Sequence, residues 1–229
     1  MDWTVASALG ATLAVLRRRF LAFFVVALLL TLPCLVVDMI GINPLADFLF
    51  TAISDVLVAI CLTAGTIRAM VGKKTDFIEL LWKLYNSCGT RLFFLTLLQT
   101  FAIALGFVLL AVPGLYLLAL WAVATPVMIV ERTTIGEALS RSVKLTEGRR
   151  WSVLGTLVAG GLITGLLALG LVLAFDLHHQ PDSNAAKVLR WTISAAIMTV
   201  LICVPAVLYV LLRQEKEGVT AQQMAGALD

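Results

Sequence analysis

Charged residues are scarce in this sequence, and their scarcity excludes an ordinary soluble domain. Asp, Glu, Lys and Arg make up only 14% of the 229 residues, whereas 61% are hydrophobic. Soluble domains carry about 25% charged residues. Apolar stretches also use up most of the length, so no soluble domain of useful size fits beside them. The net charge of +3 is dispersed in short segments next to these stretches, which indicates contact with lipid headgroups and no nucleic-acid partner.

Recognisable catalytic and metal-binding motifs are also missing. The sequence contains no HExxH, no GxSxG, no P-loop and no pair of aspartates in or beside an apolar run. Its two histidines, His178 and His179, are adjacent, so they point in different directions, and no third ligand stands at a metal-site spacing. We therefore expect no enzymatic activity, no cofactor and no metal ion.

Cysteine is present, but without the spacing of a redox or metal site. The four cysteines fall within or beside apolar runs and form no CxxC pattern, which favours a role as small core residues. They are Cys34, Cys61, Cys88 and Cys203. Pro33 is unsuited to the position before a lipoprotein cysteine, so the first apolar run is predicted to be a retained span.

Apolar runs of nearly bilayer length are abundant. A transmembrane helix needs about 20 apolar residues, and six runs approach that length. We therefore predict an all-α, polytopic membrane protein that forms one integral membrane domain over residues 1–229. The predicted spans are 20–38, 46–68, 92–111, 115–130, 151–174 and 188–212, and the predicted outer connections are Asp38–Leu45, Val112–Gly114 and Asp176–Lys187.

The basic residues sort to one side of these spans. Of the 17 Lys and Arg residues, only Lys187 and Arg190 fall on the other side. Because basic residues beside spans stay in the cytoplasm, both termini are predicted to be cytoplasmic, and the protein is predicted to lie in the inner membrane of a bacterium. The inner segments are then 1–19, 69–91, 131–150 and the tail from Arg213.

Two of the inner segments carry the signature of an amphipathic helix. Thr134-x-x-Glu137 is a capping-box pattern, and Asp76-x-x-Glu79 repeats it earlier in the chain. Each run ends at a glycine, Gly148 or Gly89. The apolar faces are formed by Ile135, Ala138, Leu139 and Val143 and by Ile78, Leu81, Trp82 and Tyr85. Such helices lie in the membrane interface or pack against the ends of the spans, and the sequence leaves both arrangements open.

The N-terminal segment also has an apolar helical face, although it lacks the capping acid and the closing glycine. The order of amphipathic helix and two-span hairpin therefore recurs three times. We predict three related units, 1–70, 71–131 and 132–213, followed by a cytoplasmic tail, 214–229.

Asp55 is the most suggestive polar residue within a span. An ionisable group inside a span costs roughly 2.5–3.5 kcal/mol on insertion scales, so it faces a partner or water. A role in proton or cation handling or in binding a polar substrate is one interpretation, and a hydrogen bond to a neighbouring helix is the other. Gln99, near Thr96 and Thr100, is explained adequately by hydrogen bonds between helices.

The fifth predicted span is rich in glycine. Gly161-x-x-x-Gly165 is a small-xxx-small motif, which allows helix backbones to approach closely. We expect this helix to be central in the bundle or to contact a second copy. Pro33, Pro126 and Pro205 lie inside three other spans, where each removes a backbone donor and favours a kink.

A set of ordered motifs in the second half of the chain resembles a known family. The set begins with Pro113-Gly114-Leu115-Tyr116, Pro126 and Glu131, continues with Glu137-Ala138-Leu139-Ser140-Arg141-Ser142 and Leu145-Thr146-Glu147-Gly148, and ends with Tyr209, Arg213 and Glu217-Gly218. Over residues 105–218 the chain resembles the membrane domain attached to some glycerophosphoryl diester phosphodiesterases, and the YciC-like bacterial inner-membrane proteins. The resemblance implies a polytopic inner-membrane protein without an established biochemical activity. The soluble phosphodiesterase domain has no counterpart here, so its hydrolytic activity is not carried over.

The resemblance directs attention to Glu131, Arg141 and Ser142, with Arg149 and Arg150 nearby. Glu131 ends a predicted span beside several basic residues, so an ion pair at the cytoplasmic face is its natural role. The alternative is a phosphate site for a lipid headgroup built from the three arginines, because guanidinium binds phosphate through two parallel hydrogen bonds.

These observations predict a non-enzymatic membrane protein. We expect it to associate with anionic lipid headgroups, a partner protein or a second copy, and to support membrane organisation or lipid handling. The alternative is a transporter of a lipid or small amphiphile, which rests on Asp55, Gln99, the prolines and the glycine-rich span. An intramembrane enzyme is a second, weaker alternative, because no nucleophile and base stand together in the sequence.

Overall fold

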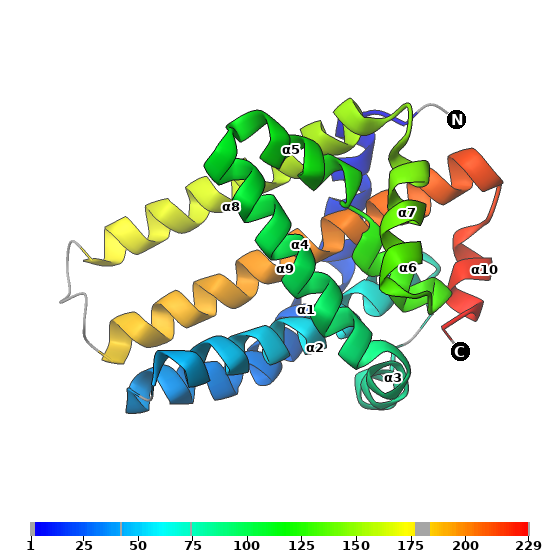
Figure 1. Cartoon of the computed structure of the whole chain (residues 1–229). Coiled ribbons are helices and arrows are strands. Elements are labelled where there is room, and N and C mark those ends of the chain that lie inside the picture. Colours follow the sequence, from blue (N-terminus) through cyan, green and yellow to red (C-terminus); the bar gives the residue numbers. More distant parts are fainter. Residues whose placement is uncertain (1–2, 42, 74, 177–183, 229) are drawn as a thin grey trace.

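The structure is a computed structural model that describes residues 3–41, 43–73, 75–176 and 184–228, and within these residues it is built from helices alone (Figure 1). The His178-His179 pair lies outside the described residues. Six helical segments are long and apolar enough to cross a membrane, as the sequence predicted. They are Val5–Ile40, Asp47–Met70, Phe77–Leu109, Val112–Glu131, Arg150–Ala174 and Asn184–Glu217.

Four long helices run alongside one another and define two ends of the bundle (Figure 1). They are α1 (Val5–Ile40), α2 (Pro44–Met70), α8 (Arg150–Asp176) and α9 (Asn184–Glu217), and α9 packs against the other three. Both termini lie at one end, called here the termini end. The turn between α1 and α2 at Gly41 lies at the opposite end, called here the far end.

Helix α1 differs from the prediction of a separate amphipathic helix before the first span. It is one continuous helix of 36 residues, about 54 Å long at 1.5 Å per residue. Thr4 caps it, and Ser7 takes the place of the acid in the capping box. Ala8 and Leu16 on its apolar face are buried in the bundle. Because a bilayer core is about 30 Å thick, the helix is long enough to project beyond one face.

The second inner segment also continues into its span without a break. Helix α3 (Phe77–Leu84) passes through one π-helical turn (Tyr85–Gly89) into α4 (Thr90–Leu109). The sequence predicts a helix end at Gly89, but the backbone there is helical, with φ −54°. A Cβ atom at Gly89 would lie 2.6 Å from the Tyr85 ring. Glycine is therefore needed to make room for that ring inside the wide turn.

The outer turn predicted at Val112–Gly114 is wrong, because these residues belong to helix α5 (Ala111–Leu120). The chain turns two residues before the predicted turn, at the extended Leu110. In Figure 1 this corner lies well short of the far end. The hydroxyl of Tyr116 accepts a hydrogen bond, 2.8 Å long, from Arg150 at the first residue of α8. Helix α5 therefore lies beside the termini end of α8.

The fourth predicted span is divided into α5 and α6 (Ala124–Glu131), with an interruption at residues 121–123. Pro126 lies in the first turn of α6, where its missing N–H needs no partner. Helix α7 (Ile135–Thr146) begins with the predicted capping box of Thr134 and Glu137. Hydrogen bonds from Thr134 lower the pKa of the exposed Glu137 carboxyl. The tail forms an unpredicted short helix, α10 (Ala221–Gly226), capped by Thr220 and Gln223.

Packing is dense at the termini end and looser at the far end. Helix α9 is buried almost continuously between Cys203 and Leu212, whereas few residues of its first half are buried. The tail adds Met224 and Leu228 to the same core. The bundle is therefore held together mainly at the end that carries both termini.

The glycine-rich helix α8 is not central, which corrects one of the two expectations for it. Only 6% of its most apolar stretch is buried. A Cβ atom added at Gly161 or Gly165 would meet no atom of another described element within 4 Å. At Gly155 and Gly160 it would meet Val5 and Val204, at 3.3 and 3.5 Å. Contact of Gly161 and Gly165 with a second copy stays a prediction.

Alanine substitution of glycines should have different effects on stability in the tightly packed α4–α5 hairpin and on the open face of α8. A Cβ at Gly114 would lie 2.6 Å from the Phe107 ring and 2.9 Å from its backbone nitrogen. We expect Gly114→Ala to destabilise the protein by about 1–3 kcal/mol, the usual cost of overpacking. Thermal unfolding in detergent measures the change. Gly161→Ala is the matched control and should leave the melting temperature unchanged; equal losses in both variants would contradict the hairpin packing.

Candidate functional site

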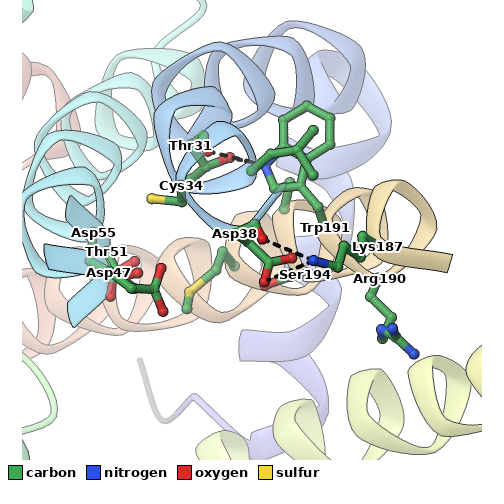
Figure 2. A pocket seen from close by; sticks show the side chains of 13 residues that line it. Thr31, Cys34, Asp38, Asp47, Thr51, Asp55, Lys187, Arg190, Trp191 and Ser194 are labelled. Atoms are coloured by element: carbon green, nitrogen blue, oxygen red, sulfur yellow. Dashed lines mark hydrogen bonds and ion pairs between the residues drawn. The ribbon is translucent and has the colours of Figure 1, made fainter. Parts of the chain in front are cut away.

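A cavity of about 310 Å³ lies at the far end between α1, α2 and α9 (Figure 2). It contains Asp55 together with Lys187 and Arg190, the two basic residues that depart from the charge asymmetry of the sequence. In the sequence these residues give separate and unrelated signals. The structure brings them together with two further carboxylates, Asp38 and Asp47.

Two of the three carboxylates in this far-end cavity lie apart from the basic residues, and the third, Asp38, lies beside Lys187. Figure 2 shows Asp47 and Asp55 beside Thr51 on one side, and Lys187 and Arg190 on the other. The spacing along each helix explains this, because residues four apart lie on the same face. Asp47, Thr51 and Asp55 therefore form one row on α2, and Lys187 and Arg190 begin another row on α9.

Only some of these groups have partners within the chain. The Lys187 ammonium donates to the backbone oxygen of Asp38 at 2.9 Å and lies 3.7 Å from its carboxylate. The indole N–H of Trp191 donates to Thr31. Among the described residues, the carboxylates of Asp47 and Asp55 make no hydrogen bond or ion pair, and no three His, Cys, Asp or Glu side chains gather to hold a metal ion.

Asp55 also opens onto a smaller cavity between α2 and α4, which it shares with Thr96 and Thr100. Those two threonines in turn line a third cavity, of about 490 Å³, together with Gln99 and Pro205. Three cavities are thus linked by shared lining residues, beginning at the far end and reaching the interruption between α5 and α6.

Gln99 lies at that interruption and makes the interhelical hydrogen bonds expected of it. Its amide nitrogen donates to the backbone oxygen of Trp121 at 2.9 Å, and its amide oxygen accepts from the Thr125 hydroxyl at 3.4 Å. The carbonyl of Trp121 follows the last turn of α5, where backbone oxygens have no partner within the helix. Gln99 therefore supports the break in the chain as well as lining the cavity.

An apolar cleft of about 400 Å³ lies on the opposite side of α9, between α1, α8 and α9. Its lining is almost entirely hydrophobic and includes Phe20, Phe24, Leu167, Leu171, Ile193 and Ile197. Ile193 and Ile197 follow Arg190 at spacings of three and seven residues. They therefore lie on the same face of α9 as Arg190, farther along the helix toward its C-terminus.

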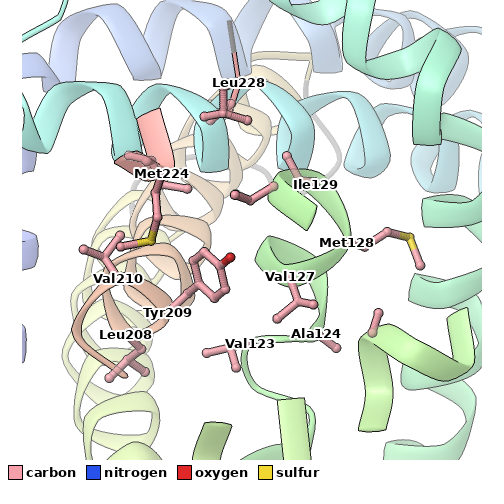
Figure 3. Packing of buried hydrophobic residues seen from close by; sticks show 14 of the residues in the cluster. Val123, Ala124, Val127, Met128, Ile129, Leu208, Tyr209, Val210, Met224 and Leu228 are labelled. Atoms are coloured by element: carbon pink, nitrogen blue, oxygen red, sulfur yellow. The ribbon is translucent and has the colours of Figure 1, made fainter. Parts of the chain in front are cut away.

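The termini end is closed by a buried core instead of a cavity. Figure 3 shows the Tyr209 ring between Val127 of α6 and Met224 of α10. Leu208, Tyr209 and Val127 are fully buried. The linked cavities therefore stop before they reach this end.

Glu131 ends α6 just beyond this core and forms the ion pair that its basic neighbours predicted. One carboxylate oxygen lies 3.2 Å from Nε of Arg141, and the other lies 3.5 Å from Arg213. The Tyr209 hydroxyl donates to the second oxygen at 3.0 Å and accepts from Arg213 at 2.9 Å. Both carboxylate oxygens of Glu131 are thus directed toward partners within the protein.

Glu217 completes a closed ring of two arginines and two glutamates, called here the ion-pair ring. It accepts from Nε of Arg213 at 2.9 Å and pairs with Arg141. The four side chains are only 17–32% exposed. Because ion pairs that are shielded from water are stronger than exposed ones, the ring joins α6, α7 and α9 firmly.

The other basic residues highlighted by the resemblance have separate partners. Arg149 contacts Glu215 through two nitrogens, at 2.6 and 2.9 Å, which ties the start of α8 to α9. Arg150 donates to Tyr116 and lies 5.5 Å from the centre of its ring. The three arginines proposed for a phosphate site are therefore engaged in three different contacts.

Ser142 acts on the backbone of a neighbouring helix. Its hydroxyl donates to the backbone oxygen of Leu120 at 2.7 Å, at the last residue of α5. Ser142 is fully buried, so this bond satisfies its buried hydroxyl. Its role in the structure is to hold α7 against the interruption between α5 and α6.

The chain matches no protein-family model, and no solved structure matches it. The resemblance over residues 105–218 therefore stays an expectation, and the function is argued from the residues of this chain.

The ion-pair ring has a measurable contribution to stability. Glu131→Gln removes the charge that both arginines share, and we expect a loss of about 1.5–3 kcal/mol, typical for hydrogen bonds to charged groups. Thermal unfolding in detergent measures it, with Glu147→Gln at an exposed carboxylate as the charge-matched control. The double variant Glu131→Gln/Arg213→Gln should lose less than the sum of the single variants. Additive losses would contradict a closed ring.

Proposed function

We propose that the protein is a non-enzymatic membrane protein that binds and handles a lipid or small amphiphile in its far-end half. The far-end cavity carries this proposal, because it holds two unpartnered carboxylates and two basic side chains between apolar helices. Charged side chains in such surroundings are costly and mark binding sites or pathways. An amphiphile would supply partners for the carboxylates and keep its apolar part in the bilayer.

We further propose that the termini end faces the cytoplasm of a bacterium and that the membrane is the inner membrane. The sorting of basic residues supports this orientation. The far-end cavity then opens in the outer half of the membrane, so it would take a ligand from the outer leaflet or from outside. Exposed Arg17, Arg18 and Arg19 on α1 are then available to anionic headgroups on the inner side.

The amphipathic helices have different roles in this proposal. Ile78 and Trp82 of α3 are 83% and 72% exposed, so this apolar face has no partner in the described chain and suits the membrane interface. Helix α7 instead buries Ala138 and Leu145 and closes the bundle. The organisation in three units, 1–70, 71–131 and 132–213, remains part of the proposal and is supported by the recurring order of amphipathic segment and apolar runs in the sequence.

Lipid retention tests the proposed function. The protein is extracted with minimal detergent and examined by native mass spectrometry, and we expect one stoichiometric bound lipid or amphiphile. Ser194 is an exposed residue that lines the far-end cavity, so Ser194→Phe should fill the space and reduce occupancy severalfold. Ser140→Phe on the exposed side of α7 is the control. Bulk lipid alone, equal in all variants, would count against the proposal and favour a scaffold for a protein partner or a second copy.

Transport is a second candidate, favoured by the linked cavities. Asp55 joins the first two cavities, and Thr96 and Thr100 join the second and third. A solute that followed them would reach the interruption between α5 and α6. Release at the other side would then require the core around Tyr209 and the ion-pair ring to open, which a two-state rearrangement of these helices would provide.

Flux measurements test this second candidate. Purified protein in proteoliposomes should take up lipid analogues or small amphiphiles, and Asp55→Asn should abolish uptake because it removes a charge that two cavities share. Asp76→Asn, at the cap of α3 and away from the cavities, is the matched control. If none of a broad panel of lipid analogues and amphiphiles is taken up, the transport candidate is wrong and the binding function alone remains.

A further inference from the structure

We infer that the apolar cleft between α1, α8 and α9 binds an anionic phospholipid, whose phosphate lies at Arg17 and whose acyl chain fills the cleft. This site is separate from the far-end cavity, so the inference goes beyond the proposed function. It is carried by the cleft of about 400 Å³ together with free arginines on the helix that forms one of its walls.

Three consecutive arginines of α1 have no counter-charge within the described chain. Arg17, Arg18 and Arg19 are exposed and make no hydrogen bond or ion pair with a described residue. Residues 3–37 contain no Asp or Glu, so this part of α1 carries positive charge alone. Such a cluster complements a phosphate, which a guanidinium binds through two parallel hydrogen bonds. The ammonium of a zwitterionic headgroup would be repelled by the same cluster, so an anionic lipid is favoured.

Arg17 lies on the same face of α1 as the two phenylalanines that line the cleft. Phe20 and Phe24 follow it at spacings of three and seven residues, and their rings stack with centres 5.6 Å apart. Arg18 instead lies on the face of Leu21, which is 75% exposed and does not line the cleft. Arg17 is therefore placed to bind a headgroup whose acyl chain enters the cleft.

The cleft runs from Arg17 toward the far end, along the direction that an acyl chain would take. Helices α1 and α8 start at the termini end and α9 ends there, so the lining of all three follows this direction (Figure 1). From Val200 to Thr192 the lining covers eight residues of α9, about 12 Å at 1.5 Å per residue. One leaflet of a bilayer core about 30 Å thick is about 15 Å deep. The cleft therefore matches most of the depth of one leaflet.

The lining of the cleft is suited to hydrocarbon and offers no free hydroxyl to a polar ligand. Its two threonines donate to the backbone of their own helix, Thr164 to Gly160 at 2.8 Å and Thr192 to Val188 at 2.7 Å. The other lining residues are Phe, Leu, Ile, Val and Ala. The volume of about 400 Å³ lies within the range of small-ligand sites, about 300–1,000 Å³. An acyl chain is therefore the part of the lipid that the cleft accommodates.

Competition between headgroups tests the role of Arg17. The intact protein is offered an equimolar mixture of dioleoyl phosphatidylglycerol and dioleoyl phosphatidylethanolamine, and the bound lipids are counted by native mass spectrometry. We expect phosphatidylglycerol to be retained in preference, and Arg17→Gln to reduce its occupancy about fivefold, the effect of one basic residue at an anionic surface. Arg18→Gln is the charge-matched control and should leave the occupancy nearly unchanged. Equal losses in both variants would show general attraction to a positive surface and would overturn the site.

Filling the cleft tests the place of the acyl chain. Ala168 of α8 lines the cleft, so Ala168→Phe should reduce retention of phosphatidylglycerol severalfold, whereas Leu169→Phe on the exposed side of α8 should not. Melting temperatures close to that of the parent protein show that both variants are folded. Glycerol phosphate carries a phosphate without chains, and its displacement of the lipid would overturn the role of the cleft. Dimers that replace the bound lipid would show that a second copy covers the cleft, and would also overturn the inference.

A variant of the far-end cavity distinguishes this inference from the proposed function. Ser194→Phe fills that cavity and should leave phosphatidylglycerol bound in the cleft. If Ser194→Phe removes the lipid and Ala168→Phe does not, the lipid belongs to the far-end cavity, so this inference is overturned and the proposed function stands. A lipid in the cleft without any ligand in the far-end cavity would support this inference and count against the proposed function.

Discussion

The Glu131 carboxylate ties three helices of this protein together. It ends α6, pairs with Arg141 of α7 and Arg213 of α9, and accepts the Tyr209 hydroxyl from within the core. Glu217 balances the charge of both arginines, so the ring is neutral and its members need no further counterion. A carboxylate in such a shielded position is costly when it is left alone, and this cost makes the arrangement of the three helices specific.

The consequence is a bundle with two different halves. Three sets of contacts hold the helices α5, α6, α7, α8 and α9 together around one buried core at the termini end. They are the ion-pair ring, the pair of Arg149 and Glu215, and the hydrogen bond from Ser142 to Leu120. At the far end, where the α4–α5 hairpin does not reach, the long helices leave cavities between them. The termini end is tightly packed, whereas the far end contains cavities and carboxylates without partners. This arrangement is suited to binding, because a ligand can fill the cavities and supply partners for those carboxylates.

Several features were readable in the sequence because they depend on neighbours along the chain. Six apolar runs indicated six helices, and the Thr134 capping box marked the start of α7. Other features were misread because a local signal had a different cause. Gly89 serves the Tyr85 ring and does not end a helix, and Pro113 and Gly114 belong to α5 and not to a turn. In each case the true role of the glycine depends on a contact with another side chain, and residue type alone does not specify that contact.

By itself, the sequence determined the class of the protein, the number of apolar helices and the sorting of basic residues, since composition and run length are properties of single segments. Tertiary structure alone decided which charges meet. Arg141 and Arg149, which resemble a phosphate site in the sequence, are neutralised by glutamates of α9, while Asp55 lies opposite Lys187 and Arg190 across a cavity. The reason is physical: a charge in an apolar bundle is governed by whichever partner the packing of other helices brings to it, and that partner lies far away along the chain.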